Sequence, residues 1–255
     1  MLLSFFLDSD LLSFIFACVT ETNEHQKLTT KREYIKVLCI IADTLGEKLI
    51  DYLHRILSLL NKKLHESEPH LNQVISDTYG VIMEKIIRKL PKNPGFKYAR
   101  EMLNGLYANL ADRDKNLQIA TSMCLIKLIQ NCPLEFLTSF HEEITRNLIE
   151  FLRAPHFKSQ THLLEALLSL ILSVEKEFRK NVDAVMEYIL EIFARNGNLE
   201  WTVKKISIDL IYTLAIILKE EVVKYKERLL ILLQERKCDK VRNFVNFSEF
   251  FHYFF

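Results

Sequence analysis

The residues that could form a catalytic metal site do not complete a known arrangement. The segment His141–Glu143 begins like the helical zinc motif HExxH, in which two histidines four positions apart bind the metal. Position 145 is Thr145, so the second histidine is missing, and we expect an ordinary solvated helix face. The stretch 65–70 holds two histidines and two glutamates, but this grouping is weak, and a surface turn is the favoured interpretation.

Other catalytic chemistry finds equally little support. The five glycines stand singly, so no glycine-rich loop could cradle a phosphate, and no nucleophile elbow or kinase motif occurs. The five cysteines are scattered and form no CxxC pair. Cys39 and Cys124 lie among apolar residues, which predicts buried, reduced thiols in an intracellular compartment. We therefore expect no catalytic residue, no metal ligand and no cofactor, and a protein that is not an enzyme.

The composition indicates long helices. The chain has 255 residues, 49% of them hydrophobic, with only five Gly and five Pro. Its formal net charge is +1, so no global field favours nucleic acid or an acidic membrane. The apolar segment 1–19 lacks a basic start and contains Asp8 and Asp10, which argues against a signal peptide. We expect this segment to be a helix and the protein to be soluble.

Short polar breaks recur about every forty residues, which is the period of HEAT or armadillo helical hairpins. Each break separates two apolar helical runs and carries a residue suited to starting a helix. The breaks lie at Thr30, Pro69, Asp114, Pro155, Asn198 and Asp239. The sequence therefore predicts an all-α fold, an α-solenoid of about six HEAT-like hairpins whose terminal units are incomplete.

Each predicted hairpin has a first helix, a polar turn and a second helix. The first helices are expected at 4–19, 49–65, 98–112, 135–153, 179–195 and 221–236. The second helices are expected at 31–45, 70–89, 115–130, 157–174, 200–218 and from 240.

Local signals support these boundaries. A capping box is predicted at Thr30–Glu33, and Asp114 is a good N-cap. Pro69 and Pro155 suit a first helical position, and Gly46 suits the left-handed residue that ends a helix.

The C-terminal end departs from the repeat. Residues 244–255 contain six Phe and one Tyr with almost no charge, whereas a helical solenoid normally closes with a polar cap. Two alternatives remain: the tail packs on the last repeat, or it marks an aberrant or incomplete terminus, which is favoured. We expect a repeat array over 1–242 and an aromatic tail over 243–255.

The turns between the paired helices concentrate basic residues. In a stack of hairpins these turns follow one edge, so a row of cations there would attract an acidic partner. The alternative is plain solvation of helix ends. The single tryptophan, Trp201, begins a second helix, where it is either a packing staple or an exposed anchor for a partner.

Several segments resemble one known family in order and spacing along most of the chain. These are Lys31–Glu33, Lys115–Ile129, Leu152–Phe157, Glu200–Lys205 and Cys238–Arg242. Together they resemble the Tortifolia/Spiral-type plant microtubule-associated proteins, whose N-terminal domain is a TOG-like array of HEAT repeats. The chain departs from the family pattern after Arg242, where a charged repeat is replaced by the aromatic tail.

The resemblance implies binding to tubulin or microtubules through the turn edge, with effects on microtubule dynamics or organisation. It also implies a cytoplasmic, cytoskeleton-associated protein. The alternative is a general HEAT-repeat scaffold or adaptor without tubulin affinity. The residues expected to bind the partner, from the turn edge and the resemblance together, are Lys31, Arg32, Arg113, Lys115, Asn116, Lys158, Trp201, Lys204, Lys205, Lys240 and Arg242.

Overall fold

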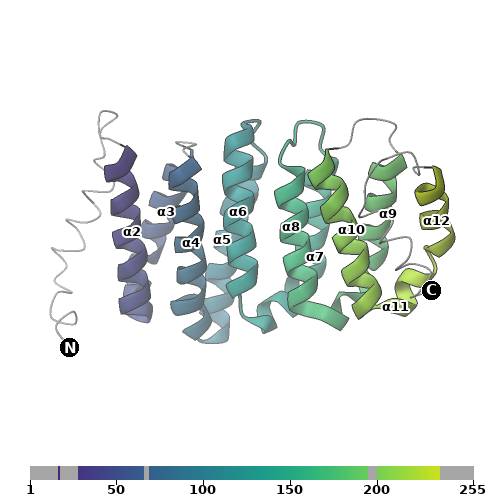
Figure 1. Cartoon of the computed structure of the whole chain (residues 1–255). Coiled ribbons are helices and arrows are strands. Elements are labelled where there is room, and N and C mark those ends of the chain that lie inside the picture. Colours follow the sequence, from purple (N-terminus) through teal and green to yellow (C-terminus); the bar gives the residue numbers. More distant parts are fainter. Residues whose placement is uncertain (1–16, 18–27, 66–68, 195–199, 236–255) are drawn as a thin grey trace. The chain divides into compact units, whose positions relative to one another are not determined.

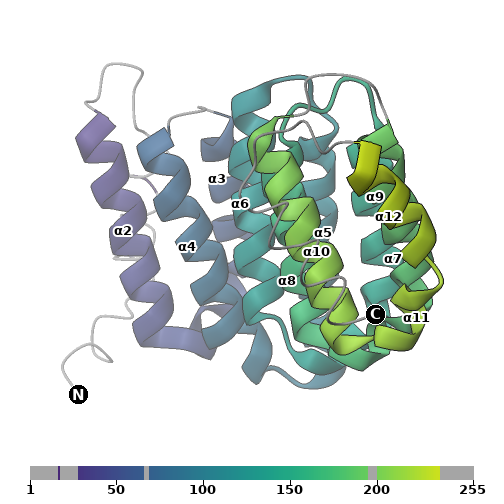
Figure 2. The same ribbon diagram turned by 45° about the vertical axis from the view of Figure 1, so that its right-hand side comes forward.

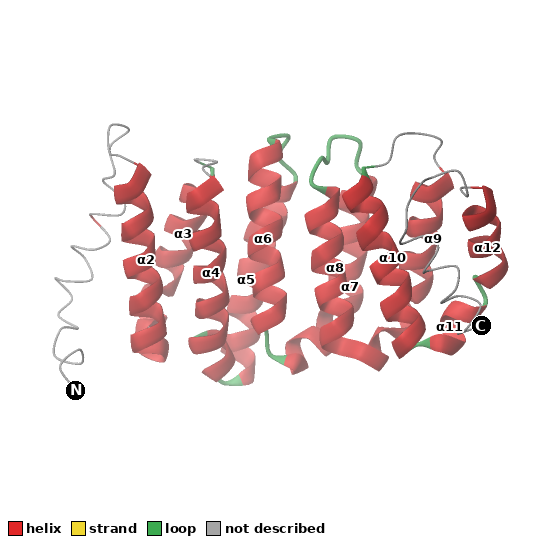
Figure 3. Ribbon diagram, in the orientation of Figure 1, coloured by secondary structure: helices red, strands yellow, loops and turns green. Residues whose placement is uncertain are grey.

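A computed structural model describes residues 17, 28–65, 69–194 and 200–235 of the chain. Within these ranges the structure consists of helices joined by short turns and contains no strand (Figure 3). The described elements, in chain order, are α2 (Leu28–Leu45), η2 (Gly46–Tyr52), α3 (Leu53–Leu64), α4 (Pro69–Lys85), η3 (Ile87–Lys89), α5 (Lys92–Leu110), α6 (Lys115–Asn131), α7 (Leu134–Arg153), α8 (Gln160–Val174), η4 (Glu175–Asn181), α9 (Val182–Ala194), α10 (Trp201–Ile217), α11 (Lys219–Val223) and α12 (Lys226–Glu235).

The chain divides into two compact units. The first contains the described residues up to Phe136 together with 155–162, and the second contains 137–154 and the described residues from 163 onward. In the first unit, α2, α4 and α6 lie side by side in one layer, and α3 and α5 form a second layer behind them (Figures 1 and 2). Fully buried Leu38, Ile75, Leu106 and Leu125 contribute to its core.

In the second unit, α9 contacts α10, α11 and α12. Its core includes the aromatic side chains Phe178 and Tyr188 and the aliphatic Leu210, all fully buried. The short η4 and α11 lead into α9 and α12, so each of these first helices is preceded by a tight helical turn.

Most predicted helices are confirmed, including three of their local signals. The Asp114 carboxylate accepts a hydrogen bond from the Leu117 amide at 2.7 Å and caps α6. Gly46 follows α2 with a φ of +52°, a conformation that costs little only for glycine. Helix α4 begins at Pro69, where a missing amide proton is not needed.

Several predicted boundaries are wrong, and three of them lie beside a threonine or a proline that the sequence marks. Helix α2 is already formed at Leu28, so Thr30 lies inside the first turn and is not the N-cap. Helix α5 begins at Lys92 instead of 98, because Pro94 falls in the first turn, where amides have no acceptor within the helix. Pro155 lies in a loop, and α8 begins only at Gln160.

The predicted helix at 4–19, the predicted helix from 240 and the aromatic tail lie outside the described residues, apart from Ala17, which is helical. The boundary at 242 therefore stays a prediction. Over the part of the chain that the structure describes, every helix is too short or too polar to cross a membrane.

Candidate protein-binding edge

The turn between α5 and α6 directs its acidic side chains toward its own backbone. Asp112 accepts a hydrogen bond from the Asp114 amide at 2.8 Å, and Asp114 caps the amide of Leu117. Both carboxylates thus stabilise the turn and the first turn of α6. The residue between them, Arg113, is exposed.

Gln118, in the second turn of α6, joins this turn to the loop between α7 and α8. Its side chain is fully buried. The amide nitrogen Nε2 donates to the Asp112 carbonyl at 2.6 Å and lies 3.5 Å from the His156 carbonyl oxygen. The amide oxygen Oε1 accepts from the Lys158 backbone N–H at 2.8 Å. One side-chain amide therefore connects the turns of two successive hairpins, both within the first unit.

Three exposed cations surround this connection: Arg113, Lys115 and Lys158. None of the three forms an ion pair with a residue that the structure describes. Asn116, also exposed, follows Lys115 on the first turn of α6. We call Arg113, Lys115 and Lys158 the cationic cluster; the two loops that carry it appear in green at the upper edge of Figure 3.

Many cations elsewhere in the first unit are paired between helices. Lys85 lies 3.5 Å from the Asp43 carboxylate, and Lys127 lies 3.3 Å from that of Asp77. The pKa of Lys85 is raised because Glu84 and then Asp43 stabilise its charged form. These pairs connect α2 to α4 and α4 to α6, so they stabilise the packing of the helices within the first unit.

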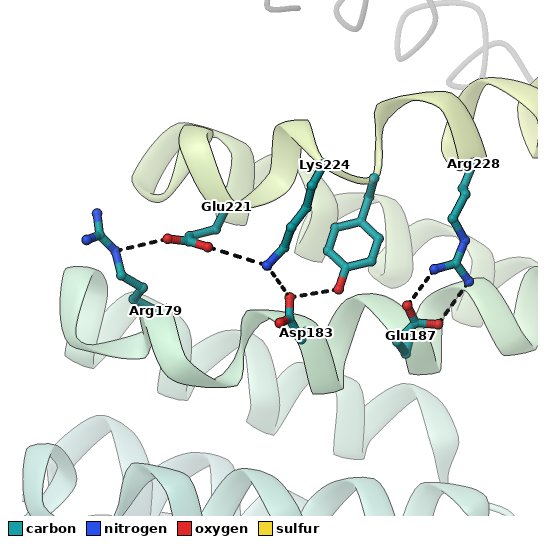
Figure 4. A network of polar contacts seen from close by, with 7 residues as sticks. Arg179, Asp183, Glu187, Glu221, Lys224 and Arg228 are labelled. Atoms are coloured by element: carbon teal, nitrogen blue, oxygen red, sulfur yellow. Dashed lines mark hydrogen bonds and ion pairs between the residues drawn. The ribbon is translucent and has the colours of Figure 1, made fainter.

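The second unit shows the same use of charge. Lys180 pairs with Glu142 at 3.0 Å and Arg153 with Glu191 at 2.6 Å, which joins α7 to the next hairpin. Figure 4 shows the following step, in which acidic residues of α9 meet basic residues after α11, and a basic residue of η4 meets an acidic residue of α11. The contacts there are Asp183–Lys224 at 2.6 Å, Arg179–Glu221 at 3.3 Å and the two-bonded Glu187–Arg228 pair.

The remaining predicted partner residues fall into two groups. Lys31 and Arg32 lie in the first turn of α2, at the same edge of the first unit as the cationic cluster (Figure 1). Trp201, Lys204 and Lys205 lie in the first turns of α10, in the second unit.

The structure thus brings Arg113, Lys115 and Lys158 together, with Asn116 beside them. Trp201 is 44% exposed, as expected of an anchor and not of a packed staple. Lys240 and Arg242 lie outside the described residues.

The segment 141–143 is not a solvated face, contrary to expectation. His141 is buried, because it points toward the next hairpin, where Asn181 Nδ2 lies 2.7 Å from its Nδ1. Only Glu142 is exposed. No group of three potential metal ligands occurs among the described residues, and both glutamates of the stretch 65–70 lie outside them.

The described cysteines are free thiols, as expected, but they differ in exposure. Cys124 is fully buried, whereas Cys39 is half-buried. Burial raises the pKa of both thiols, so neither is an activated nucleophile.

Gln118 is the residue that the sequence interpretation missed. Its position in the sequence predicts burial, because Gln118 stands between the inward-facing Leu117 and Ala120 of a helix that buries mainly apolar side chains. A polar residue at such a position needs hydrogen-bond partners, and here the adjacent turns supply them.

A family model described as TORTIFOLIA1 N-terminal matches residues 3–246. The chain belongs to the TORTIFOLIA1 N-terminal family. TORTIFOLIA1-like protein 1 of Arabidopsis thaliana is 21% identical over 238 residues, which cover 91% of this chain and 28% of that protein. TORTIFOLIA1-like protein 5 of the same plant is 21% identical over 237 residues, 92% of this chain and 46% of that protein. The chain therefore spans less than half the length of these relatives.

Solved structures establish the fold class of this TORTIFOLIA1 N-terminal family member. Kap121p superposes with a TM-score of 0.63 at 15% identity, over 96% of this chain and 23% of its own. Importin beta gives 0.63 at 20% identity, over 87% and 28%. A designed armadillo repeat protein in complex with the peptide (KR)4 gives 0.54 at 14% identity, over 96% and 99%. The predicted α-solenoid of HEAT or armadillo type is confirmed.

Proposed function

We propose that this repeat scaffold binds tubulin or microtubules through the turn edge and influences microtubule dynamics or organisation. The observation that carries the proposal is the cationic cluster of Arg113, Lys115 and Lys158. These side chains are exposed and without ionic partners in the described structure, whereas many cations on the helix faces, such as Lys127 and Lys180, are paired across hairpins. Family membership supports tubulin as the partner, because the segments of this chain resemble the Tortifolia/Spiral-type plant microtubule-associated proteins.

An acidic protein surface is the partner that such a cluster would favour. Tubulin is strongly acidic, and cations on a rigid edge speed encounter and orient the complex. Each exposed charge contributes little alone, so affinity depends on several acting together. In the second unit, Trp201 and Lys205 would add an aromatic and a cationic contact. We further propose that the protein is cytoplasmic and associated with the cytoskeleton.

The experiment is co-sedimentation with polymerised tubulin of a doubly reversed variant, Arg113→Glu with Lys158→Glu. The matched control is Arg88→Glu with Lys97→Glu. Those two residues are also exposed and carry no ion pair in the described structure, and they lie in η3 and at the start of α5, at the opposite end of the hairpin. Each pair removes four charge units, so the formal net charge falls from +1 to 1 − 4 = −3 in both variants.

We expect the edge variant to lose most of its binding and the control to keep most of it. Equal losses in both variants would mean that only net charge matters, and the edge would not be the binding surface. Unchanged binding in the edge variant would also contradict the assignment. A wild-type chain that does not sediment with microtubules would leave the alternative, a general scaffold for other proteins.

A further inference from the structure

Two loops that belong to different hairpins are held as one piece of structure in the first unit. Asp112 and Lys158 are 46 positions apart in the sequence, yet the single side-chain amide of Gln118 bonds to the backbone of both. Because that amide is buried, its hydrogen bonds do not compete with water. The cations on the two loops thus keep a fixed spacing.

The carboxylates beside these cations are already occupied. Asp112 and Asp114 accept hydrogen bonds from backbone amides of the turn and of α6. They therefore stabilise the local fold, and neither pairs with Arg113 or Lys115. The first-turn amides of α6 add a partial positive charge at the same place.

We propose that Gln118 is a positioning residue that unites the α5–α6 turn and the α7–α8 loop into one binding site for an acidic segment of a partner. Carboxylates of one such segment contact Arg113 or Lys115 and, at the same time, Lys158. This inference rests on the proposed function for the location of the binding edge, and it adds the chemical class of the ligand and the residue that sets the site's geometry.

Simultaneous contact explains why the fixed spacing matters. Once one carboxylate pairs with Arg113, a second carboxylate on the same segment meets Lys158 at a high effective concentration. If the two loops moved independently, part of that gain would be lost in ordering them on binding. Gln118 removes that cost in advance without touching the ligand.

The first test concerns the connection itself and needs no partner. Hydrogen exchange of the Lys158 backbone amide is measured in the wild type and in Gln118→Met, which keeps the side-chain volume but cannot form the hydrogen bonds. Gln130→Met, at an exposed position of the same helix, is the control. We expect faster exchange at Lys158 only in the Gln118 variant; equally slow exchange in both variants would overturn the proposal.

The second test measures coupling between the loops. A fluorescent ten-residue poly-glutamate peptide is titrated against the wild type, Arg113→Ala, Lys158→Ala and the double variant. Each single change should weaken binding about two- to fivefold. Because one segment needs both cations, the double variant should be weaker by clearly less than the product of the single effects. In the Gln118→Met background the two effects should multiply.

The outcomes separate this inference from the proposed function. If the effects of Arg113→Ala and Lys158→Ala on peptide affinity multiply in the wild type, the composite site is overturned. This outcome does not require Gln118→Met to fold. It would leave the proposed binding of tubulin through the edge intact. Coupled effects that disappear in the Gln118→Met variant would support the composite site even if the chain did not sediment with microtubules.

Discussion

At the scale of single residues, two glycines differ in whether their backbone conformation and surroundings leave room for a side chain. Gly46 has a φ of +52°, and an added Cβ would lie 3.1 Å from the Lys85 carbonyl oxygen. We expect Gly46→Ala to lower the free energy of unfolding by about 1–2 kcal/mol. Gly105 lies inside α5, where an added Cβ meets nothing within 4 Å. Gly105→Ala should raise stability by about 0.5–1 kcal/mol.

Urea unfolding of both variants and the wild type measures the two effects. The opposite signs make the comparison independent of any general effect of replacing glycine with alanine. A stabilised Gly46→Ala variant would contradict the left-handed ending of α2.

His141 makes the stability of the second unit depend on pH. Burial lowers the pKa of His141 below its ordinary value of 6.5, and Lys180 lowers it further against the opposing effect of Glu142 and Glu177. The neutral ring accepts the hydrogen bond from Asn181. Below about pH 6.5 the His141 imidazole therefore binds a proton in the unfolded chain but stays neutral in the folded chain. Stability should be complete above this pH and should fall as the pH decreases toward the folded-state pKa.

The measurement is the free energy of unfolding at about pH 7.5 and about pH 5.5, for the wild type and for His141→Gln. Other titrating groups contribute equally to both proteins, so the difference isolates His141. We expect a smaller loss of stability in the variant. Equal losses would mean that the imidazole titrates normally in the folded protein.

At the scale of elements, the contact between α9 and the segment after α11 combines a strong and a weak interaction. The Tyr225 hydroxyl donates to Asp183 at 2.7 Å from a buried ring, and Lys224 reaches the same carboxylate (Figure 4). Lys224 and then Tyr225 lower the pKa of Asp183. We expect Tyr225→Phe to cost about 1 kcal/mol, because the hydrogen bond from a buried tyrosine ring to a charged but largely exposed carboxylate is lost.

Arg228 is the control for this contact. Its two hydrogen bonds to Glu187 lower the pKa of that carboxyl, but both side chains are well exposed to solvent. Arg228→Met should therefore change the melting temperature less than Tyr225→Phe does. A larger effect at Arg228 would mean that burial of the Tyr225 ring does not strengthen its hydrogen bond relative to an exposed ion pair.

The sequence predicted the helices well because apolar periodicity determines which face is buried. It located helix ends poorly where tertiary contacts decide them. Pro155 looked like a helix start, but the backbone of the following residues bonds to Gln118, and α8 begins only at Gln160. His141 looked solvated because its partner, Asn181, lies 40 positions away. The sequence indicates that Gln118 faces inward, but not that its partners include a loop about 40 positions away.

At the scale of the whole molecule, the distribution of charge matters more than its sum. The formal net charge of +1 gives the chain no strong field. Within each unit, many charges on the helix faces neutralise one another between successive hairpins, as Lys127 does with Asp77 and Lys180 with Glu142. The cationic cluster, which has no ionic partner among the described residues, then provides the local potential to which an acidic partner would respond.

This distribution predicts how binding depends on salt. The Debye length is about 10 Å at 0.1 M salt and shortens as salt is added, so contacts between exposed charges weaken. Microtubule co-sedimentation of the wild type should therefore fall several-fold between about 50 and about 300 mM KCl. The Arg88→Glu, Lys97→Glu control should fall in parallel, because its cationic cluster is unchanged. The Arg113→Glu, Lys158→Glu variant should bind weakly at low salt and change little. A wild type whose binding is insensitive to salt would argue that apolar contacts, such as those of Trp201, dominate the interface instead of the cluster.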